Sequence, residues 1–567
     1  MFRIRWKSRP PKKGAQKNTV RQNPGVPSNP GRNSSQNTGA EEQLPEISSS
    51  VTQPDWLNLA LTGSLPKNLR ILKAIFKNCD DVVFHEFTLG QNREIRLALI
   101  YVDALSSSER LSKEILIPLK TNFGQPATNY KISIEQAFEY IKNIGADVTE
   151  TEEANQAQTI VDHILSGEAV LLVEGSSKAL IFDTRGYKTR DISESPSDRS
   201  IRGSREAFVE DLYTNTSLLR RRIKNPALKV ETSKIGRVNR TDLALIYIEG
   251  IVNPKILQEA RQRLSRIDID GALEGGQIEE FIEDSAYSLF PTVFHSDRVD
   301  KVASKLMEGR VAIILDGTPF VLTVPALFIE YFQNPEDYYQ RFMFSSAVRI
   351  LRLINFFLSI SGSALYIALS TYHSELLPTS LLLSFIAQRE MVPFPLFVEV
   401  FLMEITFEIL REAGLRMPQT LGQAVSIVGA VVLGEAGVRA GIVSAATVII
   451  VPISAIASFS FLYSSTIAFR LIRFPIIIAA SVMGLPGFII MLLLFFIHLA
   501  SLRSFGVPYL YPVAPLSDNW QQDTFCRVPW WAMLKRPRFL SGNLRRESSG
   551  QIPQPPADPP NREVSSK

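Results

Sequence analysis

The sequence predicts a duplicated α/β soluble region at the N-terminal side, followed by an all-α polytopic membrane domain. Three observations predict this division. Charged residues concentrate before Arg352, long apolar runs follow it, and two phrases of mixed helix and strand character recur within the first half. A chain of 567 residues is also too long for one hydrophobic core, so several domains are expected.

Both ends of the chain are polar. No acidic residue precedes Glu41, and residues 1–55 are expected to form a disordered basic tail because they cannot bury enough apolar area to offset the entropy of ordering. This tail either keeps the protein soluble or binds an anionic lipid surface. Residues 1–17 lack the apolar core of a signal peptide, so the N-terminus is expected in the cytoplasm. Residues 517–567 are predicted to form a cytoplasmic C-terminal tail.

The soluble half contains an internal repeat. Residues 243–264 parallel residues 97–116, each a short apolar strand followed by a helix. Residues 299–324 parallel residues 161–182, each a helix, a glycine, a strand, an acid–glycine turn and a second strand. Two phrases repeated in the same order predict a duplication. The predicted α/β subdomains are residues 56–195 and 196–330.

No catalytic motif occurs in this half. The phosphate-binding, zinc-protease and nucleophile-elbow patterns are missing, and His85, His163 and His295 are isolated. Cys79 and Cys526 lie far apart without a metal-ligand spacing. The small net charge of +4 argues against nucleic-acid binding. We therefore expect a binding or assembly module without cofactor or metal, and a membrane-bound enzyme is the least favoured class.

Residues 331–516 are predicted to form the transmembrane domain. About four segments approach the roughly 20 apolar residues that a spanning helix needs, namely residues 353–371, 421–440, 442–469 and 474–502. Residues 325–332 are too short to span and are expected at the membrane interface. Basic residues before the first span and after the last favour both termini inside, which would leave Arg411, Arg470 and Arg473 outside.

Interfacial helices are predicted between the first two spans, over residues 379–412. The second of them carries Glu399, Glu404, Glu408 and Glu412 at steps of five, four and four, which places the acids near one helix side. One interpretation is an amphipathic helix with a wetted acidic side. The other is that symmetric copies form an acidic ring that gathers cations at a pore mouth.

The second predicted span has small residues at every fourth position from Gly422 to Gly434. Such a stripe allows close helix packing. Alternatively the segment lines a pore, in which Gln423 and Ser426 face water while Val425 or Val428 forms a narrow dry gate.

Five motifs in the second half carry a resemblance to a known family. They are NPEDYY at 334–339, REMVPFP at 389–395, EITFEILREAGLR at 404–416, GQAVSIVG at 422–429 and HLASLRSFGVPY at 498–509. In this order they resemble the A subunit of the bacterial spore germinant receptor, the GerA family, and the resemblance covers about residues 56–516.

The resemblance implies a location in the spore inner membrane and two partners, a transporter-like B subunit and a lipoprotein C subunit. It also implies a homo-oligomer of A subunits that releases monovalent cations when a nutrient is sensed. Our first hypothesis is therefore a nutrient-triggered channel subunit. The second is a membrane-anchored sensor or scaffold that assembles the receptor without conducting ions.

Overall fold

The computed structural model describes most of the chain between residues 59 and 553. The described residues are 59–89, 95–124, 138–139, 141–142, 151–186, 202–416, 434–461, 463–516, 523–546 and 552–553. The predicted tail at residues 1–55 and the predicted subdomain boundary at 195/196 lie outside these ranges.

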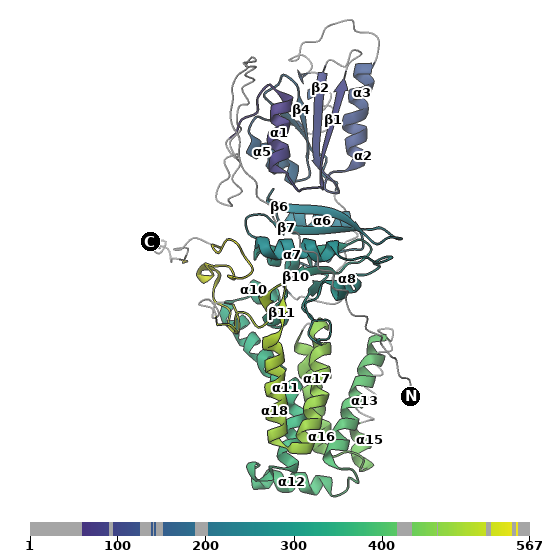
Figure 1. The fold of residues 1–567 in the computed structure, drawn as a ribbon, viewed down its shortest axis with the longest axis vertical. Helices are drawn as coiled ribbons and strands as arrows, with labels where there is room; N and C mark the ends of the chain where they lie inside the picture. The colour runs from purple at the N-terminus through teal and green to yellow at the C-terminus, as the bar shows by residue number, and fades with distance from the viewer. Residues whose placement is uncertain are drawn as a thin grey trace, which may run out of the picture. The chain divides into compact units, whose positions relative to one another are not determined.

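The first sheet has five antiparallel strands in the order β1-β2-β4-β5-β3 (Figure 1). The strands are β1 (Val82–Leu89), β2 (Ile95–Val102), β3 (Thr151–Ala154), β4 (Ala169–Val173) and β5 (Ala179–Phe182). The helices are α1 (Leu65–Ile75), α2 (Ser108–Arg110), α3 (Ile117–Gly124) and α5 (Ala157–Leu165), with a π-helical segment at Leu111–Leu116 between α2 and α3.

Helices cover both faces of this sheet. Successive strand residues point to opposite faces, so the wholly apolar β4 needs cover on both. Val170 and Leu172 pack into one cluster with α1 and α5, while Leu171 and Val173 pack into another with the helical segment after β2. Because both faces of β4 are covered, all of its residues are apolar and its sequence is a continuous apolar run.

The second sheet repeats this topology in the order β6-β7-β9-β10-β8. Its strands are β6 (Leu228–Ile235), β7 (Thr241–Ile248), β8 (Phe294–Ser296), β9 (Val311–Leu315) and β10 (Val321–Val324). Its helices are α6 (Leu212–Arg222), α7 (Pro254–Ser265), α8 (Gly275–Ile282) and α9 (Val299–Met307).

The repeated phrases occupy equivalent places in the two sheets. The α5–β4–β5 unit of the first corresponds to α9–β9–β10 of the second. Gly167 and Gly309 follow the two helices with φ of 93° and 98°, and Gly175 and Gly317 form the two hairpin turns with φ of 87° and 88°. Glycine adopts this left-handed region at little cost, which is why the glycines recur in the repeat. The same topology in both sheets is what the predicted duplication requires.

The C-terminal half is helical. Its helices are α10 (Glu336–Tyr339), α11 (Phe342–Thr371), α12 (Thr379–Arg389), α13 (Leu396–Arg416), α15 (Gly434–Arg439), α16 (Ala445–Ala457), α17 (Tyr463–Met483) and α18 (Leu485–Ser501). Short 3-10 turns occupy Phe328–Phe332, Ser374–Leu376, Ser458–Ser460 and Trp530–Ala532, and a two-stranded ribbon joins β11 (Arg503–Ser504) to β12 (Val507–Pro508). Among the described helices, α11 is the one long and apolar enough to cross a bilayer.

Two predicted spans were wrong as single helices. Residues 442–469 break near Phe461 into α16 and α17, and residues 474–502 break at Gly484 into α17 and α18. Gly484 has φ of 66° and Pro486 follows at the start of α18, so the chain turns there. Apolarity alone does not show these turns, because apolar residues lie on both sides of each turn.

The helix α13, which was predicted as an interfacial helix, contacts α11, α16 and α17. The helices α11 and α16 approach each other closely at Gly362, where an added Cβ would overlap Ser454 Oγ. Small residues allow such close helix approach. The second repeat of the soluble half is connected to this bundle through a shared core.

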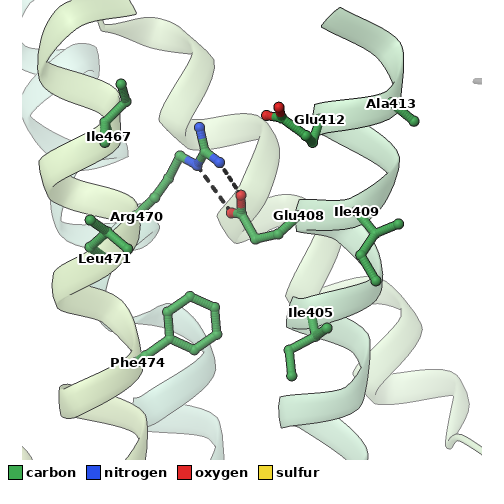
Figure 2. Close-up of a pocket in the computed structure, with 9 residues that line it drawn as sticks. All are labelled: Ile405, Glu408, Ile409, Glu412, Ala413, Ile467, Arg470, Leu471 and Phe474. Atoms are coloured by element: carbon green, nitrogen blue, oxygen red, sulfur yellow. Dashed lines mark hydrogen bonds and ion pairs between the residues drawn. The ribbon is translucent and has the colours of Figure 1, made fainter. Parts of the chain in front are cut away.

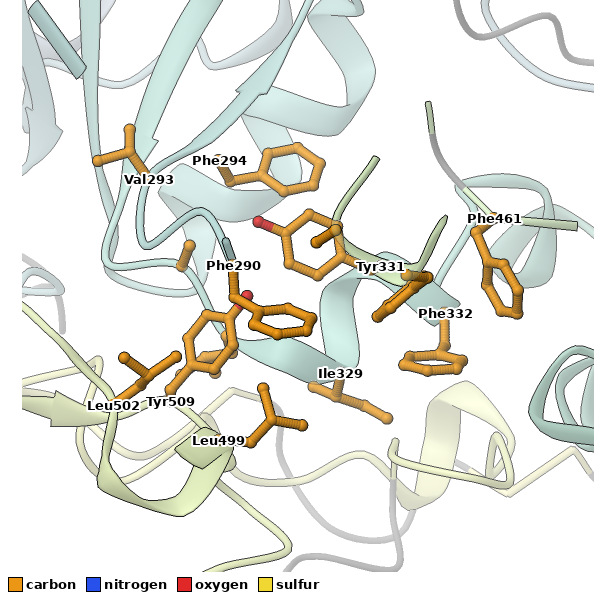
Figure 3. Close-up of a cluster of buried hydrophobic side chains, with 14 of the residues drawn as sticks. Phe290, Val293, Phe294, Ile329, Tyr331, Phe332, Phe461, Leu499, Leu502 and Tyr509 are labelled. Carbon is orange, nitrogen blue, oxygen red and sulfur yellow. The ribbon is translucent and has the colours of Figure 1, made fainter. Parts of the chain in front are cut away.

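Aromatic side chains form that shared core, which joins the second sheet to the helical half (Figure 3). Phe290 has its ring centroid 6.0 Å from that of Phe469 in α17. The hydroxyls of Tyr331 and Tyr509 both donate to the carbonyl of Pro291, at 3.1 and 3.0 Å. The segment at residues 325–332, expected at the membrane interface, therefore supplies buried core residues instead. The sequence alone does not show whether a short apolar segment lies at a membrane interface or in the core of the protein.

One carboxyl beside this core should make stability depend on pH. Burial raises the pKa of Glu283 from 4.5 to about 7, and the charge of Glu279 adds to the rise. The folded protein then holds this proton up to about pH 7 while the unfolded chain releases it near 4.5. The stability that protonated Glu283 contributes is therefore present at low pH, and it is lost as the pH rises from 4.5 to about 7.

We expect Glu283→Gln to stabilise the protein by roughly 1–2 kcal/mol at pH 8, after allowance for solvent screening, and to change little at pH 4. Thermal unfolding of both proteins between pH 4 and 8 measures this. Glu210→Gln is the control, because Glu210 is exposed and is not among the charges that act on Glu283, and it should leave the pH profile unchanged. Parallel pH profiles for Glu283→Gln and the unmodified protein would contradict the prediction.

Candidate functional site: a charged cluster between the C-terminal helices

The helix α13 brings acidic side chains into the helical bundle. Glu399 and Glu404 are fully buried, and Glu408 is partly buried one turn after Glu404. Residues four apart lie on one helix side, so Glu404 and Glu408 point the same way. The side they occupy is the one that faces α17.

Glu404 forms an ion pair inside the bundle. Its Oε2 accepts from Arg473 Nη1 of α17 at 2.5 Å, and its Oε1 accepts from Ser363 Oγ of α11 at 2.6 Å. Arg473 is 1% exposed and Ser363 is also 1% exposed, so no part of this triad is in water. Burying two charges costs several kcal/mol each, which excellent geometry offsets only in part. The triad ties three helices together at one point.

Glu408 is the centre of a second set of contacts, whose side chains are less buried than the first. Its carboxylate pairs with Arg470 of α17, accepts from Arg411 Nη1 at 3.2 Å and lies 3.7 Å from Arg473 Nη2. Figure 2 shows Glu408 and Arg470 reaching toward each other between the two helices. A cavity of about 670 Å³ opens here, lined by Ile405, Glu408, Ile409, Glu412, Ala413, Ile467, Arg470, Leu471 and Phe474.

Glu399 has a different role, at the start of α16. Its Oε1 accepts from both the backbone N–H and the hydroxyl of Ser444, each at 2.5 Å. Ser444 is in turn the N-cap of α16, where its hydroxyl accepts from Thr447 N. A carboxylate at a helix N-terminus is stabilised by the free N–H groups and by the helix dipole. Glu399 thus connects the beginning of α13 to the beginning of α16.

The acids proposed for a pore mouth therefore lie against neighbouring helices. At Glu399 and Glu404 the acidic side of α13 is buried, where an interfacial helix would have a wetted side. Glu408 is the member of the three that faces a cavity. The predicted pore-lining residues Gln423, Val425, Ser426 and Val428 lie outside the described residues. The pore-mouth role of the acids and the pore-lining role of these four residues therefore stay predictions.

Sequence reasoning missed the arginine partners. The topology prediction left Arg411, Arg470 and Arg473 on the outer side of the membrane and gave them no partners, yet all three contact Glu408. A signal was present in the sequence. Arg470 and Arg473 are three apart and Glu404 and Glu408 are four apart, so each pair forms one stripe on its helix. Opposite charge stripes on two apolar helices indicate that the helices pair.

The described side chains of the cluster are carboxylates and guanidinium groups paired with one another. Among the residues that the structure describes, no three His, Cys, Asp or Glu side chains gather as metal ligands would. Ionisable groups at membrane depth face a partner or a cavity and commonly mark ion or substrate pathways. Here both features occur together, since Glu404 has its partner and Glu408 has a cavity.

Comparison with known proteins gives a family. Residues 70–539 match the model of the Bacillus/Clostridium GerA spore germination protein family. The chain is 46% identical over 499 residues to spore germination protein KA of Bacillus subtilis, covering 88% of this chain and 90% of that protein. It is 37% identical over 480 residues to spore germination protein B1 of the same organism, covering 84% and 98%.

Two further matches come from a membrane protein and a solved structure. The Bacillus subtilis membrane protein YfkQ is 40% identical over 496 residues, covering 87% of this chain and 95% of YfkQ. The N-terminal domain of the A subunit of the Bacillus megaterium spore germinant receptor GerK3 is 34% identical. It covers 48% of this chain and 98% of that domain, with a TM-score of 0.38. The chain belongs to the GerA family of spore germination proteins, the family of germinant receptor A subunits.

Proposed function

We propose that this protein is a nutrient-triggered, oligomeric channel-forming subunit that releases monovalent cations during spore germination. Family membership supports the role in germination. The observation that favours conduction over simple anchoring is the charged cluster, because an anchor needs no buried Glu404–Arg473 pair and no charged cavity at Glu408.

In this proposal the chain crosses the spore inner membrane several times with both termini in the cytoplasm. The apolar helices α11, α16, α17 and α18 are the segments that we place within the bilayer, although α16 and α18 are short. Residues 56–195 and 196–330 are two soluble lobes that promote assembly of identical A subunits. The transporter-like B subunit takes the nutrient and the lipoprotein C subunit completes the receptor.

Gating requires that the nutrient-bound partner favour the open state over the closed one, since equal affinity for both would shift nothing. The segment 421–440 is our proposed pore lining, with Val425 or Val428 as the gate. Glu399, Glu404 and Glu408 belong to the helix that we place at the entrance, and Glu408 is the acid best placed to meet an ion because it faces a cavity.

The test is potassium efflux from spores that carry single substitutions. Val425→Phe and Val428→Phe should each change the nutrient-triggered efflux rate by about tenfold or more, because a gate residue controls pore width directly. Ile449→Phe is the matched control, since Ile449 is exposed on α16 and takes the same ring without touching the proposed gate.

Unchanged efflux for both valine variants would remove this segment from the pore. A purified A, B and C complex that binds nutrient but passes no cations in liposomes would favour the rival role, a membrane-anchored sensor or scaffold. Recording flux with and without the partner subunits therefore separates the two functions.

A further inference from the structure

A second cavity lies apart from the charged cluster, in the region before α11. It has a volume of about 660 Å³ and is bordered by α9, by the chain between β10 and α11, and by residues 530–546 after the last helix. Cavities of this size hold small organic ligands. Nothing in the proposed conduction path uses it.

The described lining of this cavity carries an excess of positive charge. Six cationic side chains line it, namely Arg222, Lys301, Lys305, Arg310, Arg536 and Arg546. Three acids accompany them, namely Asp300, Glu308 and Glu330. Each acid already has a cationic partner in the chain, and the lining keeps three positive charges in excess.

Two arginines of the lining have guanidinium groups that differ in their partners. Arg310 is 3% exposed, and among the described residues its Nε has no hydrogen-bond partner. Arg536 donates from Nε to the carbonyl of Met307 at 2.8 Å, and its Nη1 donates to the carbonyls of Asn543 and Arg545. Burial lowers the pKa of Arg536 and the nearby charge of Arg546 lowers it further, while the charge of Glu308 opposes the shift only in part.

Apolar and aromatic groups complete the lining. Trp530 is 45% exposed, and its Nε1 donates to the carbonyl of Tyr338 at 3.3 Å, which orients the indole. Met307 and Ile251 contribute aliphatic surface. Guanidinium groups beside aromatic rings suit a planar anion, because the planar fork matches carboxylate or phosphate oxygens while the ring system stacks or packs.

We propose that this cavity binds a small organic anion, with its carboxylate or phosphate held by Arg310 and Arg536 and its apolar part against Trp530 and Met307. The anionic group belongs either to a free small molecule or to a lipid headgroup. The proposal stands independently of ion conduction, because binding can be measured without flux.

The experiment uses the full-length protein in phosphatidylcholine nanodiscs and follows binding by titration calorimetry. Benzoate and inorganic phosphate are the anionic probes, and benzamide is the neutral match to benzoate. We expect saturable binding of at least one anion, and benzamide about tenfold weaker than benzoate or absent. Arg536→Gln should weaken anion binding about tenfold, because it removes the charge and keeps a donor.

Arg538→Gln is the matched control, since it removes the same charge two residues away from an exposed side chain outside the cavity. It should bind as the unmodified protein does. A second arm adds phosphatidylglycerol to the nanodiscs and follows the melting temperature. A rise that Arg536→Gln abolishes, without binding of the free anions, assigns the anion to a lipid headgroup. The proposal is overturned if neither arm responds to Arg536→Gln, or if benzamide binds as well as benzoate.

Discussion

Replacing Glu404 by Gln is expected to destabilise the helical half by about 3–5 kcal/mol. The carboxylate pairs with the Arg473 guanidinium at 2.5 Å, and both side chains are buried. The substitution keeps the shape of the side chain but leaves the buried Arg473 with only its 3.7 Å contact to Glu408, an acid that Arg411 and Arg470 already share. Breaking one half of a buried pair costs much more than the pair itself contributes.

Thermal unfolding of the purified protein in detergent measures this loss. The double variant Glu404→Leu with Arg473→Met removes both charges, and we expect it to recover most of the lost stability. Glu435→Gln is the control, because its ion pair with Arg439 is exposed and should be worth about 1 kcal/mol or less. Equal effects of Glu404→Gln and Glu435→Gln would contradict a buried pair.

The second large effect is expected at Glu330, in the turn between the second sheet and α11. Its carboxylate accepts from Lys305 Nζ at 2.5 Å, pairs with Arg310 and accepts from Leu327 N at 2.6 Å. All three charged side chains are buried. Glu330→Gln would leave two buried cations without their shared anion, at a cost of about 3–5 kcal/mol.

The same carboxylate should contribute to acid sensitivity. Burial alone would raise the pKa of Glu330, but the charges of Arg310 and Lys305 hold it below its usual value. A lowered folded pKa means stability that is present above the unfolded pKa and lost as pH falls through the folded one. Unfolding midpoints from pH 7 downward should therefore fall for the unmodified protein and fall less for Glu330→Gln. Glu210→Gln is again the exposed control, and an equal acid slope in the unmodified protein and in Glu330→Gln would refute the assignment.

The soluble half was predictable because its signals are local. The glycines at positions 167, 175, 309 and 317 mark the same helix ends and hairpin turns in both repeats, and the apolar runs of β4 and β9 follow directly. The helical half was less predictable. Turns at Phe461 and Gly484 interrupt runs of uniform apolarity, so a hydropathy pattern joins helices that the chain separates.

The charged cluster could not be assembled from local patterns. Glu404 and Arg473 are 69 positions apart, and which side of α13 meets which side of α17 depends on the packing of α11 and α16 between them. The acids were recognised as one helix side, but their arginine partners were not recognised. The acidic side of α13 forms ion pairs with α17 once the two helices are packed together.

The distance in sequence between Glu404 and Arg473 has a consequence for biosynthesis. If α13 and α17 enter the bilayer in the order in which they are synthesised, the carboxylate of Glu404 is already present when Arg473 emerges from the ribosome. An arginine at the centre of a spanning helix disfavours insertion by about 2.5–3.5 kcal/mol. An ion pair with an acid in a helix that has already inserted offsets that penalty. Glu404 would therefore help α17 to insert, and the same ion pair would later stabilise the folded protein.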